Sequence, residues 1–209
     1  MTQFIQQIRI EGLSTILLNS VCVLLFYSII NKITKLVIGK TPGYEKESQK
    51  NPVYLGIVFI LMSSLLIVFG WSIEFLKGII LLEILLYASV SDIQTHEVKD
   101  LVSILLFITG FIGICFTDIP MMFLSGFIIG GMLLICAMVS GNRLGGADIK
   151  ISAACAFLFG FPKCIVGLII GLFLAIIINM FISYKRKTKG KAFPLVPYLS
   201  IGFMAVYFI

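Results

Sequence analysis

Long apolar runs separated by short polar connections dominate the chain. Charged residues, Gly or Pro bound each run, and most runs approach the roughly 20 residues that a helix needs to cross a bilayer. The runs cover residues 13–37, 53–71, 74–92, 101–117, 120–140, 148–162, 163–183 and 193–209. This pattern predicts an all-α fold, a polytopic membrane helix bundle of about eight transmembrane helices. The run 148–162 is the shortest, and a re-entrant element is the alternative for it.

Composition excludes a soluble enzyme. Of the 209 residues, 59% are hydrophobic and only 12% are charged, whereas about a quarter of a soluble domain is charged. The net charge of +6 comes from short basic clusters between apolar runs. Because these clusters form no continuous basic face, we expect no nucleic-acid partner. The five cysteines are scattered through apolar runs without paired spacing, so we expect buried small side chains and no metal site.

The basic residues alternate between the two ends of the apolar runs. All of the sixteen Lys and Arg residues except Arg9, Lys77 and Lys163 lie in or beside alternate connections. Short loops rich in Lys and Arg stay on the cytoplasmic side of a membrane. We therefore expect both termini outside the cell. The connections expected inside are 38–52, 93–100, 141–149 and 184–192.

Two acidic residues occupy unusual positions. Asp92 closes the run 74–92, and Asp148 opens the run 148–162, so that the predicted topology puts both at the inner face. Taken singly, each has an ordinary explanation, because Asp is a common helix cap and a common residue at the headgroup level. Their joint placement at one depth and on one side favours a pair of carboxyl groups that work together.

Such a pair is suited to peptide hydrolysis. Two carboxyl groups about 3 Å apart cannot both ionise and share one proton. The ionised member takes a proton from an attacking water, and the protonated member donates to the peptide carbonyl oxygen. This chemistry needs no metal and no cofactor, and we expect neither.

A stretch of small residues directly precedes Asp148. Gly145, Gly146 and Ala147 leave room for an extended substrate backbone to approach the carboxyl group, and we assign these three to substrate binding. Asp148 would then lie at a helix N-terminus, where the helix dipole favours a negative charge. We therefore expect Asp148 to be the ionised partner and Asp92 the protonated one.

Two stretches resemble motifs of the type IV prepilin peptidases, which are membrane aspartic proteases of the GxGD type. Ser91–Leu101 is similar to the family's first aspartate and the step into the next helix, and Gly145–Ala154 is similar to its Gly-x-Gly-Asp-x-Lys stretch. Phe193–Leu199 is a weaker likeness to the entry into the family's last helix. Together with the helix pattern, the likeness covers roughly residues 53–209.

The resemblance implies that Asp92 and Asp148 are the catalytic pair of an aspartic endopeptidase. Its substrates would be prepilin or pseudopilin precursors, whose leader is cut at the cytoplasmic face of the bacterial plasma membrane. The chain would then be a single integral membrane domain, 1–209. Residues 1–52 would form the first helix and a short cytoplasmic loop, and 53–209 would form the catalytic helix bundle.

The sequence departs from the family pattern at three places. Ala147 stands where the second glycine of GxGD is expected, which costs strain if that position needs a positive φ. Lys99 replaces an expected proline. The connection 38–52 contains no cysteine, unlike the insert that accompanies N-methylation in many members. We therefore expect a short form that cleaves its substrates but does not methylate them.

Four other polar residues lie in or near the run that Asp92 closes. His96, Glu97 and Asp100 spell HExxD, which does not match the zinc motif HExxH; Glu97 and Asp100 instead suit attraction of a basic leader. Glu83 lies deeper in the same run as Asp92, on the opposite face.

The alternatives to a peptidase are a small proton-coupled transporter, which tends to hold acids in broken helices near mid-membrane, and a non-catalytic scaffold of a pilus or secretion assembly.

Overall fold

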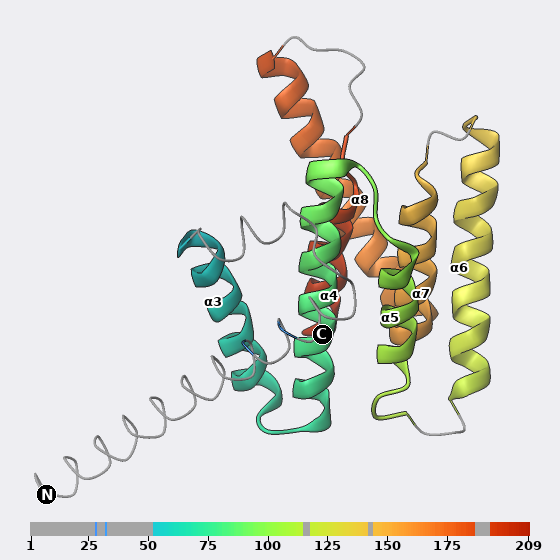
Figure 1. Cartoon of the computed structure of the whole chain (residues 1–209). Coiled ribbons are helices and arrows are strands. Elements are labelled where there is room, and N and C mark those ends of the chain that lie inside the picture. The colour runs from blue at the N-terminus through green and yellow to red at the C-terminus, as the bar shows by residue number, and fades with distance from the viewer. Residues whose placement is uncertain (1–27, 29–31, 33–51, 115–117, 142–143, 187–192) are drawn as a thin grey trace, which may run out of the picture.

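The structure is a computed structural model, and every element in the part that it describes is helical. It describes residues 28, 32, 52–114, 118–141, 144–186 and 193–209. The helices are α3 (Pro52–Phe69), α4 (Ile73–Thr95), α5 (Asp100–Gly110), α6 (Ile119–Val139), α7 (Gly146–Phe159), α8 (Phe161–Arg186) and α9 (Val196–Tyr207). Figure 1 shows them side by side, with α4, α9 and α8 at the centre and α5, α7 and α6 to one side.

The described helices follow the predicted apolar runs closely. Seven of the eight runs coincide with one helix each, and the first run, 13–37, lies outside the described residues. The largest difference is in 101–117, where α5 ends early at Gly110 and Gly113 turns the chain with φ of 73°. The run 148–162 forms the short helix α7, and Gly160, with φ of 78°, separates it from α8.

Two of the described helices are long and apolar enough to cross a membrane by length and composition. They are α6, over Ile119–Val139, and the part of α8 over Phe161–Ile182. The expected total of about eight spans is therefore not reached by the helices described. Residues 56–69, α5 and α9 are apolar but shorter than a full span.

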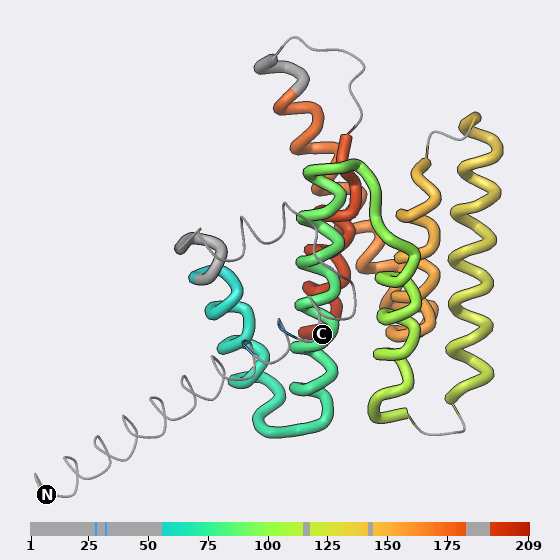
Figure 2. The backbone as a smooth tube through the Cα atoms, in the orientation of Figure 1, coloured from blue at the N-terminus to red at the C-terminus, as the bar shows by residue number. Residues whose placement is uncertain are grey.

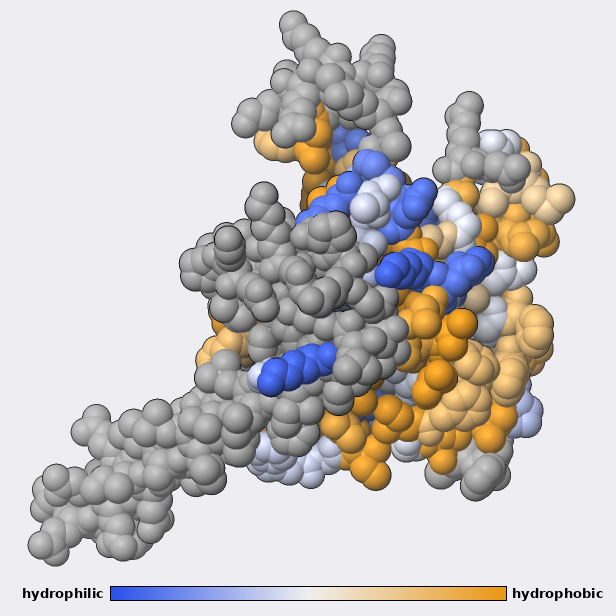
Figure 3. Space-filling view, in the orientation of Figure 1, coloured by the Kyte–Doolittle hydropathy of each residue, from blue (hydrophilic) through white to orange (hydrophobic). Residues whose placement is uncertain are grey.

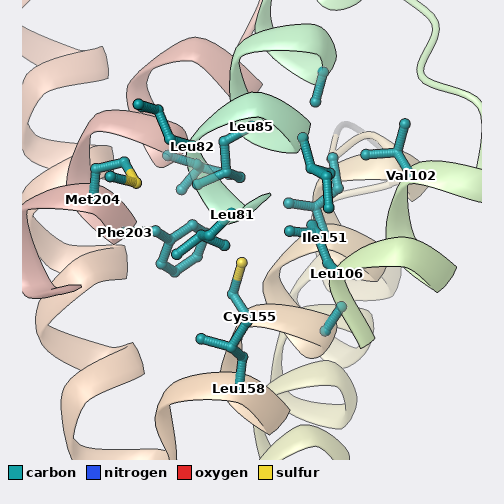
Figure 4. Packing of buried hydrophobic residues seen from close by; sticks show 14 of the residues in the cluster. Leu81, Leu82, Leu85, Val102, Leu106, Ile151, Cys155, Leu158, Phe203 and Met204 are labelled. Carbon is teal, nitrogen blue, oxygen red and sulfur yellow. The ribbon is translucent and has the colours of Figure 1, made fainter. Parts of the chain in front are cut away.

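The core lies where α4, α5, α7 and α9 meet. Helix α7 packs against α5, α6 and α8, while α9 packs against α8 and α4. Figure 4 shows buried side chains from these four helices pointing toward one another, among them Leu81, Leu106, Ile151 and Phe203. The core thus links the last turns of α4 to the first turns of α7 and α9, the parts of the fold that carry the sequence motifs.

Small residues let α8 and α9 come unusually close. A Cβ atom added at Gly202 of α9 would collide with the backbone of Gly167 and Gly171 in α8. Gly167 and Gly171 are four residues apart, a spacing typical of helices that pack closely in lipid. The contact holds α9 against the bundle, so it also determines where the N-terminus of α9 lies.

Three of the helix ends that border connections expected on one side of the membrane lie at one end of the bundle. The end of α4 and the beginnings of α7 and α9 lie toward the top of Figure 1, and the backbone trace in Figure 2 shows the same; the chain descends from the end of α4 before α5 begins. Lys99 and Lys150 belong to this end. Lys77 and Lys163 line a common cavity at the opposite end, with Tyr207.

Candidate active site

Asp92 lies in the last turn of α4, and its side chain is buried, with 8% of its surface exposed. Helix α4 continues three residues past it and ends at His96, which caps the helix in the left-handed conformation with φ of 53°. Polar contacts shape the turn that follows: the hydroxyls of Ser91 and Thr95 both donate to the carbonyl of Glu97, at 2.8 and 3.0 Å. These contacts turn the chain sharply into α5 and leave the Asp92 carboxyl group facing the bundle.

The N-terminus of α9 binds the Asp92 carboxyl group. The backbone N–H of Val196 donates to Asp92 Oδ2 at 3.0 Å, and the N–H of Leu195 is a second donor. Val196 is the first residue of α9 and Leu195 is its N-cap, so neither N–H has a partner within the helix. Pro197 marks this helix start. The sequence of Phe193–Leu199 resembles a family motif but does not reveal this role, because the donors are backbone groups.

Asp148 is the third residue of α7 and is half-buried. Its carboxyl group accepts a hydrogen bond from the backbone N–H of Gly145, the N-cap residue. This is the reciprocal half of a capping box, in which an acidic side chain at the third helical position reaches back to the N-cap. A Cβ atom at Gly145 would lie only 2.8 Å from Asp148 Oδ2, too close for the present geometry.

The other two residues assigned to substrate binding lie beside Asp148 at the start of α7. Gly146 is exposed, and a Cβ atom there would meet nothing within 4 Å. Ala147 has helical backbone, and His96 is the one non-glycine residue of the described chain with a positive φ. The strain anticipated at Ala147 is therefore absent, because an early helical position accepts alanine readily.

The structure brings the two aspartates close enough to interact electrostatically. Burial, followed by the charge of Asp92, raises the pKa of Asp148 to about 6, although the hydrogen bond from Gly145 acts against this shift. Burial also raises the pKa of Asp92, but the N–H of Val196, the charge of His96 and the N–H of Leu195 oppose that rise. Both residues lie outside the two candidate membrane spans.

These shifts favour Asp148 as the protonated partner, whereas the sequence favoured Asp92. Helix N-termini act on both carboxyl groups, so the dipole at α7 does not distinguish them. What distinguishes them is the pair of N–H donors from α9, which stabilises the ionised form of Asp92. Asp92 suits the base and Asp148 the acid of a coupled pair.

An ion pair connects the two motifs at the surface. Lys150 Nζ lies 2.6 Å from Asp100 Oδ1 and thereby joins the first turns of α7 and α5. Both side chains are more than half exposed, so the pair adds little to stability. The ion pair does compensate the negative charge of Asp100. Glu97, three residues earlier in the sequence, is exposed.

The remaining polar candidates have other surroundings, although the charge of His96 acts on Asp92. Glu83 is fully buried within α4, and His96 is exposed at its end. Within the described segments, no group of three or more His, Cys, Asp or Glu side chains could hold a metal ion. Cys155 and Cys164 are buried as expected, but Cys136 is exposed on α6, and the other two cysteines lie outside the described residues.

Comparison with known proteins gives one match, to a part of the chain. No significant match was found among curated proteins or among solved structures. A family profile does match: residues 79–181 fit the type IV leader peptidase family, whose members are membrane-associated. The matched segment includes both aspartates and runs from the middle of α4 into the last turns of α8. The match thus relates the segment 79–181 to the type IV leader peptidase family.

Proposed function

We propose that the protein is an intramembrane aspartic endopeptidase that removes the leader from type IV pilin-like precursors at the cytoplasmic face of the membrane. The observation that carries the proposal is the electrostatic coupling of Asp92 and Asp148. These residues come from the two motifs that resemble the family's aspartates, and one of them holds a proton to about pH 6. A leader peptidase of the aspartic type needs such a pair.

The reaction follows from the different surroundings of the two groups. Ionised Asp92 accepts a proton from a water molecule, whose oxygen bonds to the carbon of the scissile peptide while protonated Asp148 donates to the carbonyl oxygen. As the tetrahedral intermediate collapses, the C–N bond breaks, Asp92 returns its proton to the leaving amine, and Asp148 takes back the proton from the oxygen. The pair ends in its starting state.

The decisive test is cleavage of a pilin-type precursor, a short basic leader joined to one apolar helix, co-expressed with the protein. Wild type should convert the precursor to the shorter product, which a gel resolves. Asp92→Asn and Asp148→Asn should each lower the rate by at least about 100-fold, the size of a general acid–base contribution. Asp118→Asn makes the same change at an exposed aspartate that precedes α6, at the opposite end of the bundle, and serves as the control. Undiminished cleavage by both Asn variants would contradict the proposal.

The cytoplasmic position of the site rests on the distribution of basic residues. Lys99 and Lys150 lie at the end of the bundle that holds the aspartates, and basic residues favour the inner side. In a cysteine-free background, Gln94→Cys should react with an impermeant thiol reagent only after cells are opened. Trp71→Cys, in the connection at the other end, should react in intact cells. The reverse labelling pattern would put the site outside.

We propose further that the product leaves with an unmodified amino terminus. The connection 38–52, where many family members carry a cysteine-containing insert, has no cysteine here; it lies outside the described residues. Mass spectrometry of the product formed in cells should show the mass of the unmethylated peptide. A product heavier by one methyl group, dependent on this protein, would overturn this part of the proposal.

A further inference from the structure

An apolar groove opens between α5, α6 and α7. Its cavity has a volume of about 630 Å³. Its walls include Phe107 from α5, Phe123, Gly131 and Leu134 from α6, and Ala153 and Phe157 from α7. Figure 3 shows the apolar surface that α5 and α6 present on this side, with hydrophilic surface above it.

The groove begins next to Asp148. Ile149 and Lys150, the two residues that follow the aspartate, line its upper end. From there it runs along α7 as far as Phe157, a distance of about 12 Å at 1.5 Å per residue. A helix lying in the groove would therefore pack over about two turns. The groove therefore starts at the residues that directly follow Asp148 in α7.

The groove is lined by small and aromatic residues, a combination that suits the packing of another helix. The rings of Phe107 and Phe157 lie 4.2 Å apart and close its base, while Ile104 and Phe127 remain 56% and 77% exposed along its walls. Gly130 already packs on Ala153, since a Cβ atom there would lie 3.1 Å from the alanine Cβ.

Gly131 differs from Gly130, because a Cβ atom there would meet nothing within 4 Å. Exposed glycine lets a second helix approach closely in lipid, and the described helices leave this space open.

We propose that this groove binds the apolar helix of the precursor, next to the scissile bond. The inference rests on the proposed function, because it takes the peptide cut at Asp148 as its starting point. Two features select this occupant: the groove starts at Ile149, directly after Asp148, and its mostly apolar lining includes the open position Gly131. The occupant is a single helix of apolar residues, and the groove rather than the two aspartates supplies affinity for it.

A matched pair of glycine variants tests the groove kinetically. Gly131→Leu fills the open space, and Gly56→Leu makes the same change on α3, where a Cβ atom also meets nothing within 4 Å. With the pilin-type precursor as substrate, Gly131→Leu should raise KM about tenfold and change kcat less than about twofold, since uniform binding is lost. Gly56→Leu should match wild type. Equal KM values for both variants and wild type would overturn the proposal.

Photo-crosslinking provides a readout that does not depend on Gly131→Leu folding correctly. A benzophenone amino acid replaces Phe127 in the groove wall or, as control, Ile67, which is 83% exposed on α3. With Asp92→Asn added to prevent turnover, position 127 should crosslink to the apolar helix of the precursor and position 67 should not. Crosslinks from position 127 only to lipid, or only to residues 1–51 of this chain, would overturn the proposal. Failure of wild type to cut the precursor would instead refute the proposed function.

Discussion

The backbone N–H of Val196 donates to Asp92 Oδ2 at 3.0 Å, which ties the first residue of α9 to the last turn of α4. Val196 is fully buried, and the hydroxyls of Ser89 and Ser200 meet at 3.0 Å along the same two helices. The position of α9 therefore affects the pKa of Asp92, because the N–H donors of the helix favour the carboxylate and oppose the rise in pKa that burial causes.

Gly202→Ala should disturb this relationship from a distance. The added Cβ collides with the backbone of Gly167 and Gly171, so α9 must move away from α8. We expect the free energy of unfolding to fall by about 1–3 kcal/mol, as for other overpacked contacts, and cleavage to weaken as Asp92 loses its donors. Denaturant titration in detergent measures the first effect. Gly56→Ala, at an open helical position, serves as control, and equal stability of the two variants would contradict the reasoning.

Cleavage should have a pH optimum, with a lower kcat/KM at both higher and lower pH. Activity requires protonated Asp148 and ionised Asp92, so kcat/KM should fall as pH rises through about 6, where Asp148 loses its proton. It should fall again at lower pH as Asp92 becomes protonated. Initial rates across buffered detergent solutions measure this profile. A kcat/KM value that stays flat from about pH 5 to about pH 8 would argue against the pair.

Stability should depend on pH through the same residue. The pKa of Asp148 is raised from 3.8 to about 6 in the folded state, so between these values the folded protein binds more protons than the unfolded chain. Its stabilising contribution is complete below about pH 4 and is lost as pH rises through about 6. Asp148→Asn should therefore have a higher Tm than wild type at pH 7, and the gap should close below about pH 4. A difference in Tm between the two proteins that grows as the pH is lowered would contradict this prediction.

The neighbouring glycines of the second motif should respond differently to alanine. Gly145 has φ of −65° and ψ of 137°, which alanine adopts freely, so Gly145→Ala acts only through the overlap of its Cβ with the Asp148 carboxyl group. Displacing the acid should slow cleavage by at least about tenfold. Gly146→Ala meets open space and should cost much less. Equal losses for the two variants, measured by precursor cleavage, would show that the overlap does not matter.

The sequence alone predicted the helices and the pair of aspartates. Apolar runs bounded by Gly, Pro and charged residues matched the seven described helices, because helix formation in an apolar chain depends mainly on local pattern. The alternation of basic residues put the end of α4 and the start of α7 on the same side, and both lie at one end of the bundle (Figure 1). The short likeness to leader peptidase motifs then singled out Asp92 and Asp148.

Only the tertiary structure decided how the two aspartates differ. The donors that stabilise ionised Asp92 are the backbone N–H groups of Leu195 and Val196, distant in sequence and carried by every residue except proline. Their position depends on the contact of Gly202 with α8. The groove beside Asp148 likewise exists only because three helices meet around it. A local pattern reveals which residues can carry a charge, but the pKa depends on burial and on partners that packing brings from elsewhere.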